Sequence, residues 1–214
     1  MTTLAKQARA PLCRSRAAAG RVVVAALVLA AAPWPGLSGA ALAHSFTAGL
    51  LVTGEAPAAG LSEAVRGFLL AADERDGHAN ETSDGHIGGI DVQLLPLPSD
   101  AAEQVEGLIG TPGTPDVVVV LGPEPAAVEA GREYRPGSAV LLQTPLPEGW
   151  DSDASLADFA ARYQLAHGTA PGVMAASAYQ AARRLDAAIR SQDGLDPRSS
   201  LEEAWRQTDS GPPR

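Results

Sequence analysis

Cysteine and lysine are almost absent from this chain of 214 residues. Cys13 is the only cysteine and Lys6 the only lysine, and both lie near the N-terminus. No disulfide can therefore form within the chain, and the remainder has no thiol or amine nucleophile. The GxSxG, HExxH and P-loop motifs are missing as well. The sequence predicts a protein that is not an enzyme.

Long hydrophobic runs are also lacking. The longest, Val22–Ala32, has 11 residues, whereas a helix that crosses a bilayer needs about 20. Basic residues precede this run without any acid, and Ala41-Leu42-Ala43 follows it as an A-x-A cleavage site. This pattern predicts a cleaved secretory signal over residues 1–43, a periplasmic protein and no stable membrane anchor. An uncleaved N-terminal anchor is the alternative.

Positive charge is scarce in what remains after cleavage. The whole chain has 16 basic and 25 acidic residues and a formal net charge of −9. Five basic residues and no acid precede His44, so 11 cations and 25 acids remain, for a charge of −14. Nucleic acids and anionic membrane surfaces both require clustered cations. We therefore expect neither as a partner.

Apolar runs alternate with helical periodicity after the signal, which is typical of βαβ units. Val117–Val120 is a continuous β-branched run, as expected for a central strand covered on both faces. The predicted strands are Phe46–Val52, Ile90–Leu95, Asp116–Leu121 and Ala139–Gln143. We predict an α/β three-layer sandwich with a parallel sheet of about four strands. One domain spans residues 44–209, and residues 210–214 form a disordered tail.

Helices are predicted between and after these strands. Leu61, Val65, Phe68, Leu69 and Ala72 form one apolar stripe. The other expected helices are Ala101–Ile109, Pro125–Ala130, Phe159–His167 behind a cap at Ser155, a helix opened by Pro171, and Leu201–Gln207.

Two segments of the chain combine small residues and turns in a distinctive pattern. The first, from Phe46 to Asp100, has a strand, a loop ending in Gly60, a helix carrying Gly67, and a Gly88-Gly89-Ile90 turn before a second strand. The second, from Phe159 to Ile189, is a helical pair. The characteristic residues of this pair are Phe159, Tyr163, Gly168, Pro171, Ala175-Ala176 and Tyr179.

These segments resemble the two ends of a type I periplasmic solute-binding protein of the kind that binds leucine, isoleucine and valine for ABC transporters. In that family two lobes close on the ligand. No second run of strands exists here, so the resemblance implies a single lobe of the type I fold. It further implies that the protein binds or presents something, with a small molecule, a periplasmic protein or an ABC permease as its partner. A ligand-free accessory role is a further alternative.

The resemblance also implies where a ligand binds. The family holds it with N–H groups and hydroxyls at the carboxyl ends of the strands, where ligands collect in open α/β sheets. The residues at matching positions are Thr53, Gly54, Glu55, Gly122, Glu124 and Thr144. Glu124 stands where the family offers a hydroxyl, and its charge disfavours an anion. Turn residues that only end the strands are the alternative.

A second candidate site uses histidine. Asp-Gly-His occurs twice between residues 76 and 89, which gives His78 and His86. Imidazoles eight residues apart in a Gly-rich loop can bind one Cu or Zn ion. His44, the expected mature N-terminus, should lie near them because the predicted strand Phe46–Val52 begins at the end of the sheet where this loop lies. A solvated loop without metal is the alternative, and no other cofactor is expected.

Overall fold

The computed structural model describes residues 45–75, 83–99, 114–135 and 137–210. Several predictions concern residues outside these ranges: the signal segment, His44, His78, the helix 101–109 and residues 211–214. Ser210, the first residue of the expected tail, ends a short 3₁₀ turn, η3 (Thr208–Ser210). Within the described ranges, no helix combines the length and the apolar character that a membrane span needs.

The four predicted strands are present and run parallel to one another. They are β1 (Ser45–Val52), β3 (Ile90–Leu97), β4 (Val117–Leu121) and β5 (Ala139–Gln143). A fifth strand, β2 (His86–Ile87), pairs with β3 in the antiparallel direction, and the sheet order is β2-β3-β1-β4-β5. The prediction of a purely parallel sheet is therefore wrong, and the sheet is mixed.

The Gly88-Gly89 turn is the physical reason for the fifth strand. Both glycines have positive φ, at 67° and 83°. Tight hairpin turns require this conformation, and few residues other than glycine adopt it readily. The chain therefore folds back immediately and places Ile87 opposite Ile90. A strand of two residues has too few positions to show an alternating pattern in the sequence.

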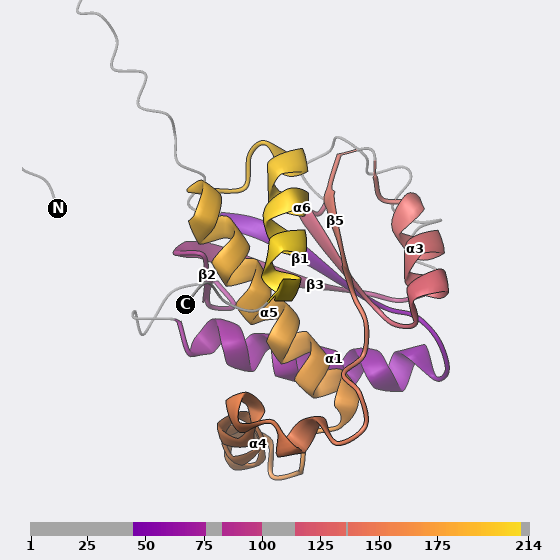
Figure 1. The fold of residues 1–214 in the computed structure, drawn as a ribbon, viewed down its shortest axis with the longest axis vertical. Coiled ribbons are helices and arrows are strands. Elements are labelled where there is room, and N and C mark those ends of the chain that lie inside the picture. The colour runs from indigo at the N-terminus through magenta and orange to yellow at the C-terminus, as the bar shows by residue number, and fades with distance from the viewer. Residues whose placement is uncertain (1–44, 76–82, 100–113, 136, 211–214) are drawn as a thin grey trace, which may run out of the picture. The chain divides into compact units, whose positions relative to one another are not determined.

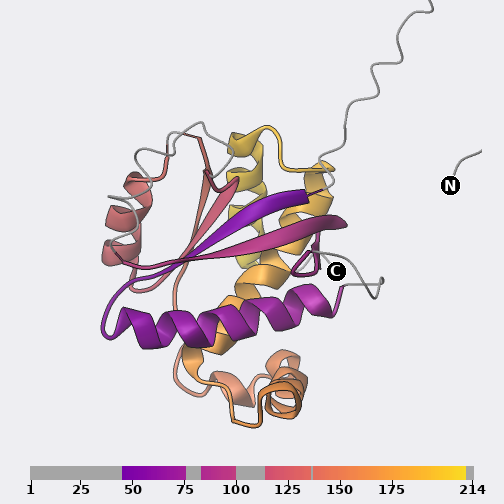
Figure 2. The same cartoon turned by 180° about the vertical axis from the view of Figure 1, so that it is seen from behind.

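Helices cover both faces of the sheet. The larger core packs α1 (Pro57–Asp73), α5 (Val173–Gln192) and α6 (Arg198–Gln207) against one face. A second core cluster places α3 (Glu124–Arg132) on the other face, as Figures 1 and 2 show. Successive valines of β4 point into the two clusters in turn, so all of β4 is buried. The prediction of a central strand is confirmed.

A contact between α1 and α5 joins the two family-like segments. A Cβ atom on Gly67 would lie 2.0 Å from the carbonyl oxygen of Ala175, so the two helices pack with backbone against backbone. The side of α5 that meets α1 and the sheet is rich in buried alanines. Helix α1 begins at Pro57, three residues before Gly60, so Gly60 belongs to the helix and not to the preceding loop as expected.

Helix α4 (Ala154–His167) follows a 3₁₀ turn, η2 (Trp150–Ser152), and is held by aromatic side chains. The ring of Phe159 lies 4.4 Å from that of Tyr179 in α5 and 5.6 Å from that of Tyr163. Helix α4 begins before Ser155, so that residue is not the helix cap that the sequence suggested.

The outer side of β5, and the part of β3 that β2 does not cover, are closed to further strands. On the outer edge of β5, the amide of Val140 donates to Glu202 Oε1 at 3.0 Å, and Trp205 Nε1 donates to the carbonyl of Leu142 at 3.2 Å. On the outer edge of β3, the amide of Leu94 donates to Asp84 Oδ2, and Pro96 has no N–H. Such devices prevent pairing with another chain.

Candidate functional site

The carboxyl ends of three strands meet at one edge of the sheet. Val52, Leu121 and Gln143 are in register across β1, β4 and β5, so the chain leaves these strands at neighbouring positions. From there α1 turns to one face and α3 to the other. The boundary between β1 and β4 is therefore a topological switch point, where open α/β sheets form a crevice for ligands.

Thr53 and Gly122 form the junction between the two strand ends. The amide of Thr53 donates to the carbonyl of Leu121 at 2.8 Å, and its hydroxyl donates to the same oxygen at 3.4 Å. A Cβ atom on Gly122 would lie 2.0 Å from Thr53 Oγ1. Gly54 follows with a φ of 103°. The structure thus brings together three of the predicted site residues, and it requires glycine at two of them.

The other predicted site residues lie in solvent around this junction. Glu55, Glu124 and Thr144 are all exposed. Glu124 is the first residue of α3, between two prolines that lack N–H groups, so few amides are left there for a ligand. A carboxylate at this position interacts favourably with the helix dipole and disfavours an anionic ligand.

A cavity of about 360 Å³ opens beside the junction, between the end of β1 and α3. This volume lies in the range of small-molecule sites. Its apolar side chains come from the sheet, from α3 and from the first turn of α1, and polar groups complete the lining. The lining residues are Leu51, Thr53, Gly54, Pro57, Ser99, Ala126, Glu129, Ala130, Glu133 and Tyr134.

Of the lining residues, the sequence analysis identified Thr53 and Gly54, and Tyr134 is the most buried polar residue among those that it missed. It is only 4% exposed, and its hydroxyl has no hydrogen-bond partner among the described residues. Burial raises the pKa of Tyr134, and the nearby charge of Glu133 raises it further. A buried hydroxyl without a partner is uncommon in folded proteins. No motif surrounds this tyrosine, so the sequence alone carried no signal for it.

The predicted metal site is described only in part. His86 lies on β2, and its Nε2 is 2.7 Å from Asp91 Oδ1. Asp91 is also in register with Ser45, the residue after His44. The described residues contain no group of three or more potential metal ligands, whereas His44 and His78 lie outside them. His86 and the start of β1 therefore share one end of the sheet, as the topology predicted.

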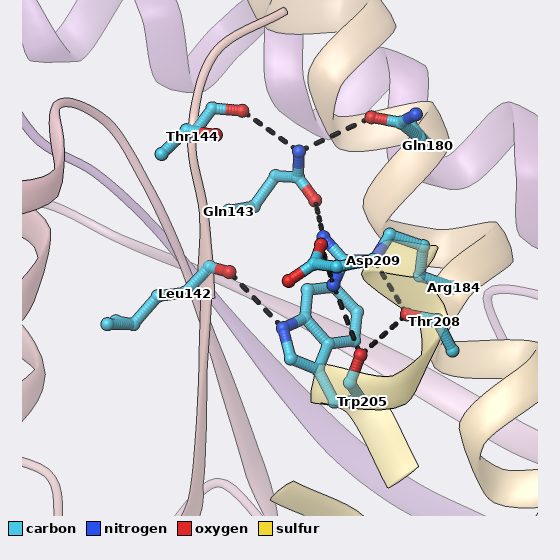
Figure 3. A network of polar contacts seen from close by, with 8 residues as sticks. All are labelled: Leu142, Gln143, Thr144, Gln180, Arg184, Trp205, Thr208 and Asp209. Carbon is cyan, nitrogen blue, oxygen red and sulfur yellow. Dashed lines mark hydrogen bonds and ion pairs between the residues drawn. The ribbon is translucent and has the colours of Figure 1, made fainter. Parts of the chain in front are cut away.

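A polar network around Arg184 ties α5 to α6 and β5 (Figure 3). The side chain of Arg184 is 12% exposed and donates to Gln143 Oε1, Thr208 Oγ1 and the carbonyl of Trp205. It also pairs with Asp209 and lies 4.0 Å from the centre of the Trp205 ring. Burial lowers the pKa of Arg184, and Asp209 opposes this shift. Because these contacts join α5 to β5, α6 and η3, the network holds α6 and η3 in place.

A second network joins α1, α4 and α5. The hydroxyl of Tyr179 donates to Glu74 Oε2 at 2.8 Å and accepts from Arg162 Nη2 at 2.7 Å. Arg162 Nε also pairs with Glu74 Oε1. Burial and the bond to Glu74 raise the pKa of Tyr179, which is 1% exposed. These contacts are internal, so this tyrosine stabilises the helix packing.

Comparison with known proteins gives no match. No family model matches the chain, and neither a curated protein nor a solved structure does.

Proposed function

We propose that this chain is an exported binding protein, built like one lobe of a type I periplasmic solute-binding protein, that holds a small molecule at the carboxyl edge of its sheet. The parallel order β3-β1-β4-β5 supports this proposal, as does the close contact of Gly67 with Ala175. That contact joins the two segments that resemble the two ends of the family's chain. It is the contact expected if a single lobe is assembled from them.

One observation carries the binding role. The switch point between β1 and β4 lies directly beside the cavity of about 360 Å³, and Thr53 and Gly54 belong to both. The combination of apolar walls and a few polar groups is typical of small-molecule sites.

A single lobe covers a ligand on one side only. Much of the ligand then stays in water, and the affinity of the lobe alone should be modest, with a Kd of about 10 μM or weaker. A partner that covers the open side would raise it. Because the outer strands of the sheet do not accept a further strand, such a partner would not bind by adding one. It would dock over the carboxyl ends of the strands, where the ligand lies. A periplasmic protein or the permease of an ABC transporter fits this role.

The test is a thermal-shift screen of amino acids, amides, amines and small acids against the purified protein. Ala126→Phe places a ring in the cavity from an exposed position of α3, and Ala157→Phe makes the same change on the exposed surface of α4. A ligand of this site should stabilise the wild type and Ala157→Phe but not Ala126→Phe. Silence across the screen, or equal binding to both variants, would contradict the proposal.

Metal capture at the other end of the sheet is the second candidate function. It is favoured by the register that places Ser45, Asp91 and His86 side by side on β1, β3 and β2. Asp91 bonds to one nitrogen of His86, which is how carboxylates orient metal-binding histidines. His44 and His78 would supply the other imidazoles, for Cu or Zn.

Titration with Cu or Zn tests this alternative. His78→Ala with His86→Ala should abolish uptake, while His167→Ala, a histidine at the end of α4, should leave it unchanged. Uptake should also be lower in acidic buffer than at neutral pH, because protonated imidazole does not bind metal. Equal uptake by both sets of variants would refute it.

A further inference from the structure

Prolines follow the carboxyl end of each of the four parallel strands. They are Pro57 after β1, Pro98 after β3, Pro123 and Pro125 after β4, and Pro145 and Pro147 after β5. Proline has no backbone N–H. Open α/β sheets commonly bind anionic groups through N–H groups at this edge and at the helix starts beside it. The sequence therefore removes donors at the edge where an anionic ligand would need them.

Two amides that remain at the strand ends are already occupied. The amide of Thr53 donates to the carbonyl of Leu121 at 2.8 Å, and the hydroxyl of Thr53 donates to the same oxygen at 3.4 Å. The amide of Gly122 donates to the carbonyl of Gln143 at 3.1 Å. The junction beside the cavity thus satisfies its own polar groups, and neither of these two amides is left for a ligand.

The space at this edge extends to the other side of Pro57 and is apolar there. A second cavity, of about 160 Å³, lies between the ends of β1 and β3 and the first turns of α1. Pro57 and Ser99 line both cavities. The other residues of the second cavity are all apolar: Val52, Ala58, Leu61, Leu97 and Pro98. None of the described lining residues of either cavity is basic. This edge therefore supplies apolar contact and no counter-ion for an anion.

We infer that this edge takes an uncharged molecule with an apolar body, and not an amino acid. The inference rests on the proposed function and names the ligand class of the same site. A carboxylate would lose hydration without gaining donors or a counter-ion, and an uncharged group avoids that cost. An ammonium group gains little either. The acids at the opening, Glu129 and Glu133, are exposed, and water and salt weaken their attraction for a cation.

The experiment uses leucine and three molecules that share its isobutyl group but differ in charge: 4-methylpentanamide, 4-methylpentanoate and 3-methylbutylamine. Affinities are measured by calorimetry on the purified protein at about pH 7 and about 0.15 M salt, where only the amide is uncharged. The amide should bind at least about tenfold more tightly than the acid and leucine, because this edge does not replace the hydration that a carboxylate loses. The amine should bind no more tightly than the amide.

A variant that returns donors to this edge tests the cause. Glu124→Ser with Pro125→Ala removes a charge and restores an N–H in the first turn of α3, next to Ala126 of the cavity lining. It should strengthen binding of the acid by about fivefold and leave binding of the amide within about twofold. Glu203→Ser, which removes one exposed charge on α6, is the matched control and should leave both affinities within about twofold.

The outcomes distinguish this inference from the proposed function. If leucine or the acid binds as tightly as the amide, or the amine binds more tightly, and Ala126→Phe blocks that binding, the ligand class is overturned while the binding function stands. If all four probes fail but another solute binds and is blocked by Ala126→Phe, an uncharged solute supports the class and a charged one overturns it. If no solute binds at all, both are overturned. An equal gain of acid binding in Glu203→Ser would overturn the explanation by local donors.

Discussion

Replacing Arg184 with leucine should lower the free energy of unfolding by about 3 kcal/mol. The largest contribution comes from Gln143 Oε1, which loses its donor at 2.7 Å in a side chain that is 4% exposed; a buried acceptor without a partner costs about 1–2 kcal/mol. Loss of the cation contact with the Trp205 ring adds about 1 kcal/mol. Asp209 is 67% exposed and becomes solvated, so its lost pair adds at most about 0.5 kcal/mol.

Urea unfolding followed by circular dichroism measures this change. With an m value of about 2 kcal/mol per molar for a domain of this size, the midpoint should fall by about 1.5 M. Arg183→Leu is the matched control, because that neighbour is exposed and lies 5.9 Å from the Tyr179 ring. It should shift the free energy by less than about 0.5 kcal/mol. Equal effects of the two substitutions would refute the reasoning from Figure 3.

Three further predictions concern stability. Gly67→Ala should destabilise the fold by more than about 2 kcal/mol in the same urea assay, because its methyl group would meet a backbone carbonyl of α5; a neutral or stabilising effect, which helix propensity alone would give, would contradict this packing. Trp205→Phe should cost about 1 kcal/mol through the lost bond to Leu142, and an unchanged melting temperature would contradict that bond. Folding raises the pKa of Tyr179 and Tyr134 above 10.0, so their contribution to stability is present below pH 10.0 and is lost as the pH rises through the folded-state pKa. Replacing both with phenylalanine should flatten this alkaline loss in thermal melts, and an identical loss in the double variant would count against it.

Much of the sheet was predictable because its signals are local. The run Val117–Val120 is continuous and β-branched, and only a strand buried on both faces explains it. Helix positions followed from apolar periodicity, although their starts did not. Helix α1 begins at Pro57, four residues before the predicted stripe at Leu61, whereas α3 begins at Glu124, one residue before its predicted start at Pro125.

The candidate site was predictable only where topology fixes it. The strand-end loops at Thr53 and Gly122 meet because parallel strands end at a common edge, whatever the side chains are. The cavity wall formed by Glu129 and Tyr134 depends on how α3, which packs on β4 and β5, lies relative to the end of β1, and no local pattern encodes this. The Arg184 network likewise joins residues 41 positions apart in the chain, and polar residues at such separations show no periodicity.

Chemical-shift mapping by two-dimensional NMR, with a solute that the thermal-shift screen finds to stabilise the protein, tests the central claim most directly, because it locates the binding on the backbone. We predict that the amides of Thr53, Gly54, Ala126 and Ala130 shift on titration. The amides of β2, at the opposite end of the sheet, and those of α4 should not shift. Saturable shifts confined to those distant elements, or no shifts at millimolar ligand, would contradict a small-molecule site at the carboxyl edge of this sheet.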